Sequence, residues 1–151
     1  MMQTLNFVPP PWRQIAEPRQ DVANGKFRQS EFAADLSQVL EGKAVIEYQD
    51  PFEFYDRTYI TEGMKGLLVK SALRVSGKGE EPVVQLKTVF GGGKTHSMLG
   101  LYHLMRSANP EKLNGIPDIL AAANINTMPK VNTAALHWTR QKRALQKNSL
   151  T

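Results

Sequence analysis

Lys87–Ser97 reads K-T-V-F-G-G-G-K-T-H-S and follows the apolar run Pro82–Leu86. This order predicts a strand, a glycine-rich turn and then a helix. Three consecutive glycines let the backbone curl with its N–H groups directed inward, where an anion also meets the positive end of the following helix. The pattern is typical of a phosphate-binding loop.

The turn fits part of the P-loop (Walker A) template G-x-x-x-x-G-K-[ST], although Thr88 stands at the template's first glycine. We expect Lys94 to bring positive charge to the phosphates and the Thr95 hydroxyl to bind Mg²⁺. The predicted nucleotide-binding residues are Gly91, Gly92, Gly93, Lys94, Thr95 and His96. The alternative is a flexible turn with a lysine nearby, and the position between a β-branched run and an amphipathic helix favours the phosphate site.

Composition indicates a globular chain, with 41% hydrophobic and 22% charged residues among 151. That length suits one ordinary domain. The sequence contains no apolar run of the ~18 to 20 residues that span a bilayer, and Met1–Pro11 lacks the features of a signal peptide. We therefore expect a cytoplasmic protein without membrane contact. The absence of cysteine excludes disulfides and thiolate metal sites and fits a reducing compartment.

The net charge of +5 belongs mainly to the end of the chain. Four of the 19 basic residues lie within Trp138–Thr151, where no acidic residue occurs, so residues 1–137 carry a net charge of +1. We expect residues 137–151 to form a solvated tail that is non-native or disordered. The alternative is a binding element that makes salt-sensitive contacts with phosphates.

Residues 1–29 predict an extended arm, because three successive prolines end its first part and remove backbone donors. A turn is expected at Asn24-Gly25. Residues 30–81 predict a helical segment. Its first helix begins after the N-cap Ser30 and ends at Gly42, and its apolar face comprises Phe32, Leu36, Val39 and Leu40.

Asp50-Pro51 predicts a second helix start, since an N-cap is followed by proline at the first helical position. An aromatic stripe and then an aliphatic one continue at helical spacing to Val75. Gly63 and Gly66 weaken the middle of this stretch. We expect either one bent helix or two helices that join near Thr61.

Residues 82–136 predict the start of a parallel sheet. Val83–Thr88 is apolar enough for burial on both faces, and Val131–Leu136 could be a second strand. Helices are expected over Thr95–Arg106 and near Pro117. The predicted fold class is therefore α/β, with N-terminal helices followed by an incomplete P-loop sheet.

The sequence gives little indication of a metal site or a catalytic site. His96 and His103 are seven residues apart and can share a helix face, but no carboxylate accompanies them, so we do not expect a metal site there. No nucleophile, base and orienting group stand at a suggestive spacing, and catalytic residues are not assigned.

Four blocks resemble a known family. They are P-W-R-Q-I-A-E-P-R-Q-D-V-A-N-G-K-F (Pro11–Phe27), E-F-A-A-D-L (Glu31–Leu36), D-P-F-E-F-Y-D-R-T-Y-I-T-E-G-M (Asp50–Met64) and P-V-V-Q-L-K-T-V-F-G-G-G-K-T-H-S-M (Pro82–Met98). In this order they are similar to the N-terminal part of large AAA-like P-loop ATP-binding proteins, a family classed as a domain of unknown function. Its members are encoded beside DNA methyltransferases in prokaryotic restriction and phage-defence loci. The similarity runs from about Pro11 to Val131.

The resemblance implies an AAA-like ATPase module that binds ATP and Mg²⁺ through Gly91–Thr95. It also implies DNA or DNA-modification proteins as partners of the parent protein. The family's loop lacks the leading glycine, so Thr88 departs from the general template and not from the family.

The resemblance fades near Thr133, whereas family members are much longer. A P-loop ATPase needs an acidic residue downstream of the loop to hold Mg²⁺, and no aspartate or glutamate follows Asp118. We therefore expect a truncated fragment that binds nucleotide without hydrolysing it. The alternative is a non-catalytic interaction fragment or an inactive remnant, whose exposed edges would favour self-association.

Overall fold

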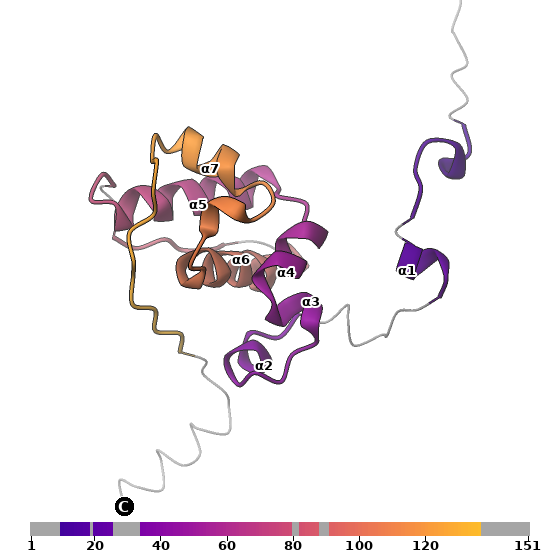
Figure 1. The fold of residues 1–151 in the computed structure, drawn as a ribbon, viewed down its shortest axis with the longest axis horizontal. Coiled ribbons are helices and arrows are strands. Elements are labelled where there is room, and N and C mark those ends of the chain that lie inside the picture. Colours follow the sequence, from indigo (N-terminus) through magenta and orange to yellow (C-terminus); the bar gives the residue numbers. More distant parts are fainter. Residues whose placement is uncertain (1–9, 19, 26–33, 80–81, 88–90, 137–151) are drawn as a thin grey trace, which may run out of the picture. The chain divides into compact units, whose positions relative to one another are not determined.

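The structure of the protein is a computed structural model, and it describes residues 10–18, 20–25, 34–79, 82–87 and 91–136 (Figure 1). The chain divides into two compact units, Met1–Phe32 and Ala33–Thr151. The first unit contains the short 3-10 helix η1 (Trp12–Gln14) and helix α1 (Gln20–Ala23). Gly25 follows α1 with a φ of +66°, which confirms the turn predicted at Asn24-Gly25.

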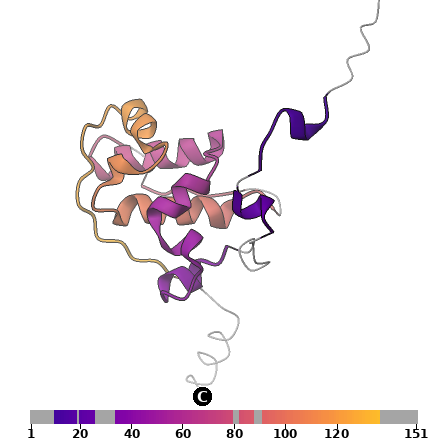
Figure 2. The same ribbon diagram turned by 45° about the vertical axis from the view of Figure 1, so that its right-hand side comes forward.

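The second unit is built from helices. They are α2 (Leu36–Leu40), α3 (Ile46–Gln49), α4 (Pro51–Arg57), α5 (Glu62–Val75), α6 (Lys94–Arg106), the 3-10 helix η3 (Pro110–Lys112) and α7 (Ile116–Ala122). Helix α6 lies beside both α4 and α5, and α7 packs on α5 (Figures 1 and 2). None of the described helices combines the length and apolar character that crossing a membrane requires.

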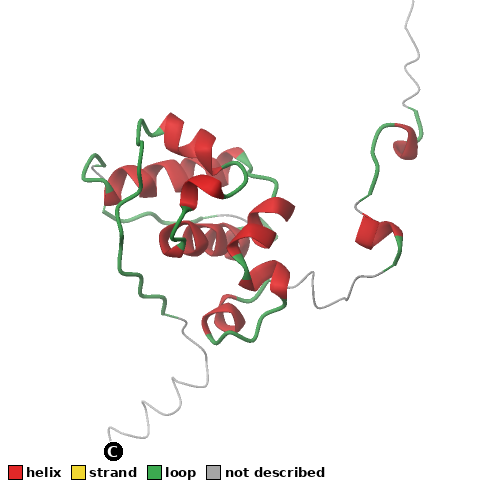
Figure 3. Cartoon of the chain, in the orientation of Figure 1, coloured by secondary structure: helices red, strands yellow, loops and turns green. Residues whose placement is uncertain are grey.

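The predicted α/β fold is wrong for the part of the chain that the structure describes, which contains helices and loops and no strand (Figure 3). Residues 83–87 and Val131–Leu136, expected in two strands of a P-loop sheet, run as irregular backbone, and Thr88 lies outside the described residues. A strand exists through pairing with a neighbour, and no backbone hydrogen bond within the described residues reaches either segment. β-branched residues favour a strand, but they form one only when a neighbouring strand pairs with them.

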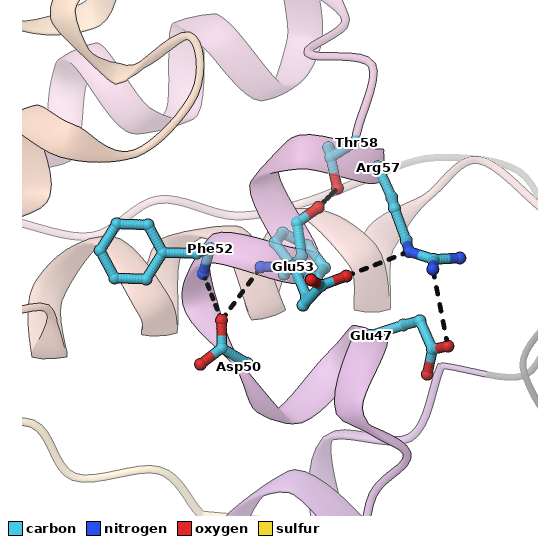
Figure 4. A network of polar contacts seen from close by, with 7 residues as sticks. Glu47, Asp50, Phe52, Glu53, Arg57 and Thr58 are labelled. Atoms are coloured by element: carbon cyan, nitrogen blue, oxygen red, sulfur yellow. Dashed lines mark hydrogen bonds and ion pairs between the residues drawn. The ribbon is translucent and has the colours of Figure 1, made fainter. Parts of the chain in front are cut away.

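The helix start predicted at Asp50-Pro51 is confirmed. The Asp50 carboxylate accepts hydrogen bonds from the N–H groups of Phe52 at 2.8 Å and Glu53 at 3.0 Å (Figure 4). The Thr61 hydroxyl accepts from the Met64 N–H at 3.3 Å and caps α5. Because each helix has its own cap, the stretch forms two helices and not one bent helix.

Other helix boundaries agree with the sequence in part. The start predicted after Ser30 is wrong, because Ala34 and Asp35 are not helical and α2 begins at Leu36, where the Asp35 carboxylate supplies the cap. Ser30 and Phe32 lie outside the described residues. Helix α2 ends before Gly42, whose φ is +71°, as predicted. Helix α6 begins one residue before the predicted start and ends at Arg106 as predicted, and α7 confirms the helix expected near Pro117.

The core lies where α4, α5, α6 and α7 meet. Its largest fully buried side chains are Tyr55, Phe54, Leu68, Leu99, Leu104, Leu113, Ile116, Ile119 and Val39. The Tyr55 hydroxyl donates a hydrogen bond to the Gly100 carbonyl of α6 at 2.6 Å. Burial raises the pKa of Tyr55, so the phenol keeps its proton and remains a donor.

Replacing Tyr55 with phenylalanine should destabilise the fold by about 1 kcal/mol, because a buried hydrogen bond between α4 and α6 is lost while the ring still fills its space. Urea denaturation followed by circular dichroism measures the change. Tyr59→Phe is the matched control, since Tyr59 is 87% exposed and its hydroxyl should contribute little. Equal midpoints for the two variants would show that the Tyr55 bond does not stabilise the packing.

Candidate phosphate-binding site

The glycine turn stands at the start of α6. Gly91 and Gly93 have φ values of +80° and +70°, a left-handed conformation that is strained for any residue with a Cβ. Gly91, Gly92 and Gly93 are all exposed, and nothing lies within 4 Å of a Cβ built on Gly91 or Gly93. Glycine is therefore required by the backbone conformation and not by crowding, and the turn is open to a ligand.

The turn presents the amides of the first helical residues. Gly93 is the N-cap of α6 and offers no side-chain cap, and the helix closes its first bond from the Ser97 N–H to the Gly93 carbonyl at 2.8 Å. The amides of residues 94–96 therefore have no acceptor within the helix. With the positive end of the helix dipole, they favour an anion at this position.

Lys94 and Thr95 begin the helix directly after the turn. Thr95 is exposed, whereas Lys94 is half-buried and lines a cavity of about 780 Å³. An ammonium group and a hydroxyl thus accompany the glycine amides at one end of α6. This donor set suits a polyphosphate with Mg²⁺, since magnesium accepts a hydroxyl ligand when phosphate oxygens supply others.

The side chain of His96 is engaged with α4. Its Nε2 atom lies 2.9 Å from the Thr58 hydroxyl oxygen, and its ring centroid lies 4.6 Å from that of Phe54. The Thr58 hydroxyl donates to the Phe54 carbonyl at 2.6 Å (Figure 4), so it accepts from a proton on His96 Nε2. Burial lowers the pKa of His96, which favours the neutral ring.

His103 packs on the same phenylalanine. It is buried, its ring centroid lies 5.1 Å from that of Phe54, and its Nε2 donates to the Tyr48 carbonyl at 2.8 Å. Burial lowers the pKa of His103, and the Tyr48 carbonyl and the charge of Asp50 partly oppose that shift. Within the described ranges, no three histidine, cysteine, aspartate or glutamate side chains gather as a metal site.

The contacts that fix α6 were not predicted from the sequence. The spacing of His96 and His103 placed them on one helix face, but only the fold shows that Phe54 packs against both rings. The one sequence signal for this packing was the aromatic stripe after Asp50, whose helical spacing matches that of the two histidines. His96 is thus a packing residue through its side chain, and it contributes its amide to the helix start.

Stability should fall as the pH drops from about 7 to about 5, because both histidines have lowered pKa values when folded. Below the ordinary histidine pKa of about 6.5, the unfolded chain takes up protons that the folded chain resists, so the stabilisation present above that pH is lost. Thermal melting across this range measures the loss.

The variant His96→Gln/His103→Gln should show a smaller change in melting temperature over the same range, since its amides donate without titrating. His137→Gln is the control; His137 lies outside the described residues. A double variant with the wild-type dependence on pH would assign the effect to other groups.

Comparison with known proteins gave one family match. A family model described as the DUF499 N-terminal domain matches residues 12–133, which include the glycine turn and all helices from α2 to α7. No curated protein and no solved structure matches the chain. The family match confirms the expected membership of a family named for a domain of unknown function. The ATPase activity and the link to DNA methyltransferases stay predictions.

Proposed function

The chain belongs to the DUF499 family, and from that premise we propose that it binds ATP together with Mg²⁺ at residues 91–95. The observation that carries the proposal is the exposed turn, in which Gly91 and Gly93 adopt left-handed conformations directly before a helix of 13 residues. Backbone amides at a helix start, followed by a lysine and a threonine, form the chemistry of a phosphate cradle.

Each residue of the turn has a distinct role in the proposal. The amides of Gly91, Gly92 and Gly93 surround the phosphate oxygens, and the exposed glycines leave space for them. Lys94 pairs with the β- and γ-phosphates, and the Thr95 hydroxyl is a ligand of the Mg²⁺ that the nucleotide brings. His96 supports the site through its contact with α4 and its backbone amide.

Binding without hydrolysis is the activity proposed for these 151 residues. Hydrolysis requires a carboxylate that holds Mg²⁺ and helps to position water, and no aspartate or glutamate follows Asp118 in the sequence. The chain would therefore hold ATP without cleaving it.

The cellular role proposed for the parent protein is DNA modification or phage defence in the cytoplasm, with DNA or DNA-modification proteins as partners. It rests on the sequence blocks described above and on the lack of cysteine. The nucleotide-binding proposal is independent of this role, because it depends on the turn alone.

Lys94→Ala should weaken binding of a non-hydrolysable ATP analogue at least about tenfold, since charge-assisted hydrogen bonds to phosphate are lost. Isothermal titration calorimetry with Mg²⁺ measures the affinity. Lys112→Ala is the matched control, because Lys112 is exposed and lies on η3. Equal affinities for wild type and Lys94→Ala would reject the assignment.

Thr95→Ala tests the metal separately. It should reduce affinity in the presence of Mg²⁺ and change it little when Mg²⁺ is chelated, because only the hydroxyl ligand is removed. The same loss with and without Mg²⁺ would contradict a role for Thr95 in metal binding.

A further inference from the structure

An apolar cavity of about 780 Å³ lies on the side of α6 that faces α5. Helix α5 contributes Leu67 and Val75 to its lining, and α6 contributes Met98, Leu101 and Tyr102. The irregular segment 82–87 runs between α5 and α6 in both ribbon views, and residues 82 and 84–86 line the cavity (Figures 1 and 2). Segment 131–136 completes the lining.

Both irregular segments carry backbone groups suited to strand pairing. Within the described residues, no backbone hydrogen bond involves residues 82–87 or 131–136. Val131 and Thr133 are half-buried while Asn132 and Ala134 are exposed, an alternation typical of extended backbone. Unpaired backbone groups can bind a further strand, which would supply hydrogen bonds to them.

Large apolar side chains remain in contact with solvent around the cavity. Leu136 is 96% exposed, Met98 44% and Val84 42%. Exposed apolar surface gathered around a cavity is characteristic of an interaction site.

The described charged side chains that line the cavity are all basic. Lys70 and Arg74 of α5 and Lys94 of α6 line it, and none of its described lining residues is acidic. Arg74 also donates to the Gly79 carbonyl at 3.3 Å, so its guanidinium stays at the rim. A ligand of complementary chemistry combines apolar groups with negative charge.

We propose that this cavity docks an extended segment of a partner polypeptide in which apolar and acidic residues alternate. The apolar side chains enter the cavity, a carboxylate meets Arg74, and the peptide backbone pairs with segment 82–87 or 131–136. A fatty acid or a nucleic acid would satisfy the charge but leave the backbone groups unmatched, so a polypeptide strand fits best. The site lies beside the glycine turn but does not depend on ATP binding.

A fluorescein-labelled peptide of about eight alternating valine and glutamate residues, a typical strand length, is the probe. Its anisotropy should rise saturably when it is titrated with the full chain in the absence of nucleotide. A peptide with lysine in place of glutamate should bind at least about tenfold more weakly, and so should the acidic peptide with N-methylated valines, because N-methylation removes the pairing donors.

Arg74→Glu should reduce the affinity for the acidic peptide at least about tenfold and raise the affinity for the lysine peptide. Lys112→Glu should bind the acidic peptide with an affinity within about twofold of wild type. Both changes alter net charge equally, so Lys112→Glu is the matched control. Hydrogen exchange of wild-type protein gives an independent readout that needs no variant: the peptide should protect amides within 82–87 or 131–136.

Three results would overturn the proposal. One is equal affinity for the acidic peptide and its N-methylated form. Another is an equal loss of affinity for the acidic peptide in Arg74→Glu and Lys112→Glu. The third is displacement of the peptide by single-stranded oligonucleotide with no amide protection, which would assign the surface to nucleic acid. Each leaves the nucleotide titration at Lys94 unaffected, so the two proposals fail separately.

Discussion

The buried hydrogen bond from the Tyr55 hydroxyl to the Gly100 carbonyl, at 2.6 Å, joins α4 to α6. A Cβ at Gly100 would displace the Met64 methyl group and would stand 3.5 Å from the Tyr55 hydroxyl oxygen, an ordinary van der Waals distance. This hydrogen bond helps to fix α6, the helix whose start the glycine turn forms.

Two histidines of α6 make further contacts that fix this helix against α3 and α4. Phe54 of α4 packs against the rings of both His96 and His103. His96 also makes a hydrogen bond to Thr58, the C-cap of α4, and His103 makes one to the Tyr48 carbonyl of α3. Buried polar rings are tolerated when their hydrogen bonds are satisfied, and here the bonds join segments about 40 to 55 residues apart in the sequence. The start of α6 is thus positioned by packed core side chains, which is the support that a preorganised binding site needs.

The sequence predicted α4, α5, α6 and α7 because their signals are local, whereas the short helices α1 and α3 were not predicted. Asp50-Pro51, Thr61 and the glycine turn each fix a helix boundary through a cap or a backbone conformation that neighbouring residues supply. The strands were wrong because pairing is not local: Val83 and Val84 favour a strand but require a partner that the described residues do not provide. The same limit applies to the site, where the turn was visible in the sequence while the contacts of His96 with Thr58 and Phe54 depend on the fold.

In the proposed function, the turn at the start of α6 binds polyphosphate through its backbone amides. Two-dimensional ¹H–¹⁵N NMR of the full chain during titration with inorganic tripolyphosphate and Mg²⁺ tests this binding most directly, since each glycine amide gives its own signal. We expect saturable shifts centred on the amides of Gly91, Gly92, Gly93 and Lys94. Unchanged signals at these four amides, with shifts confined to the basic residues of 137–151, would contradict it.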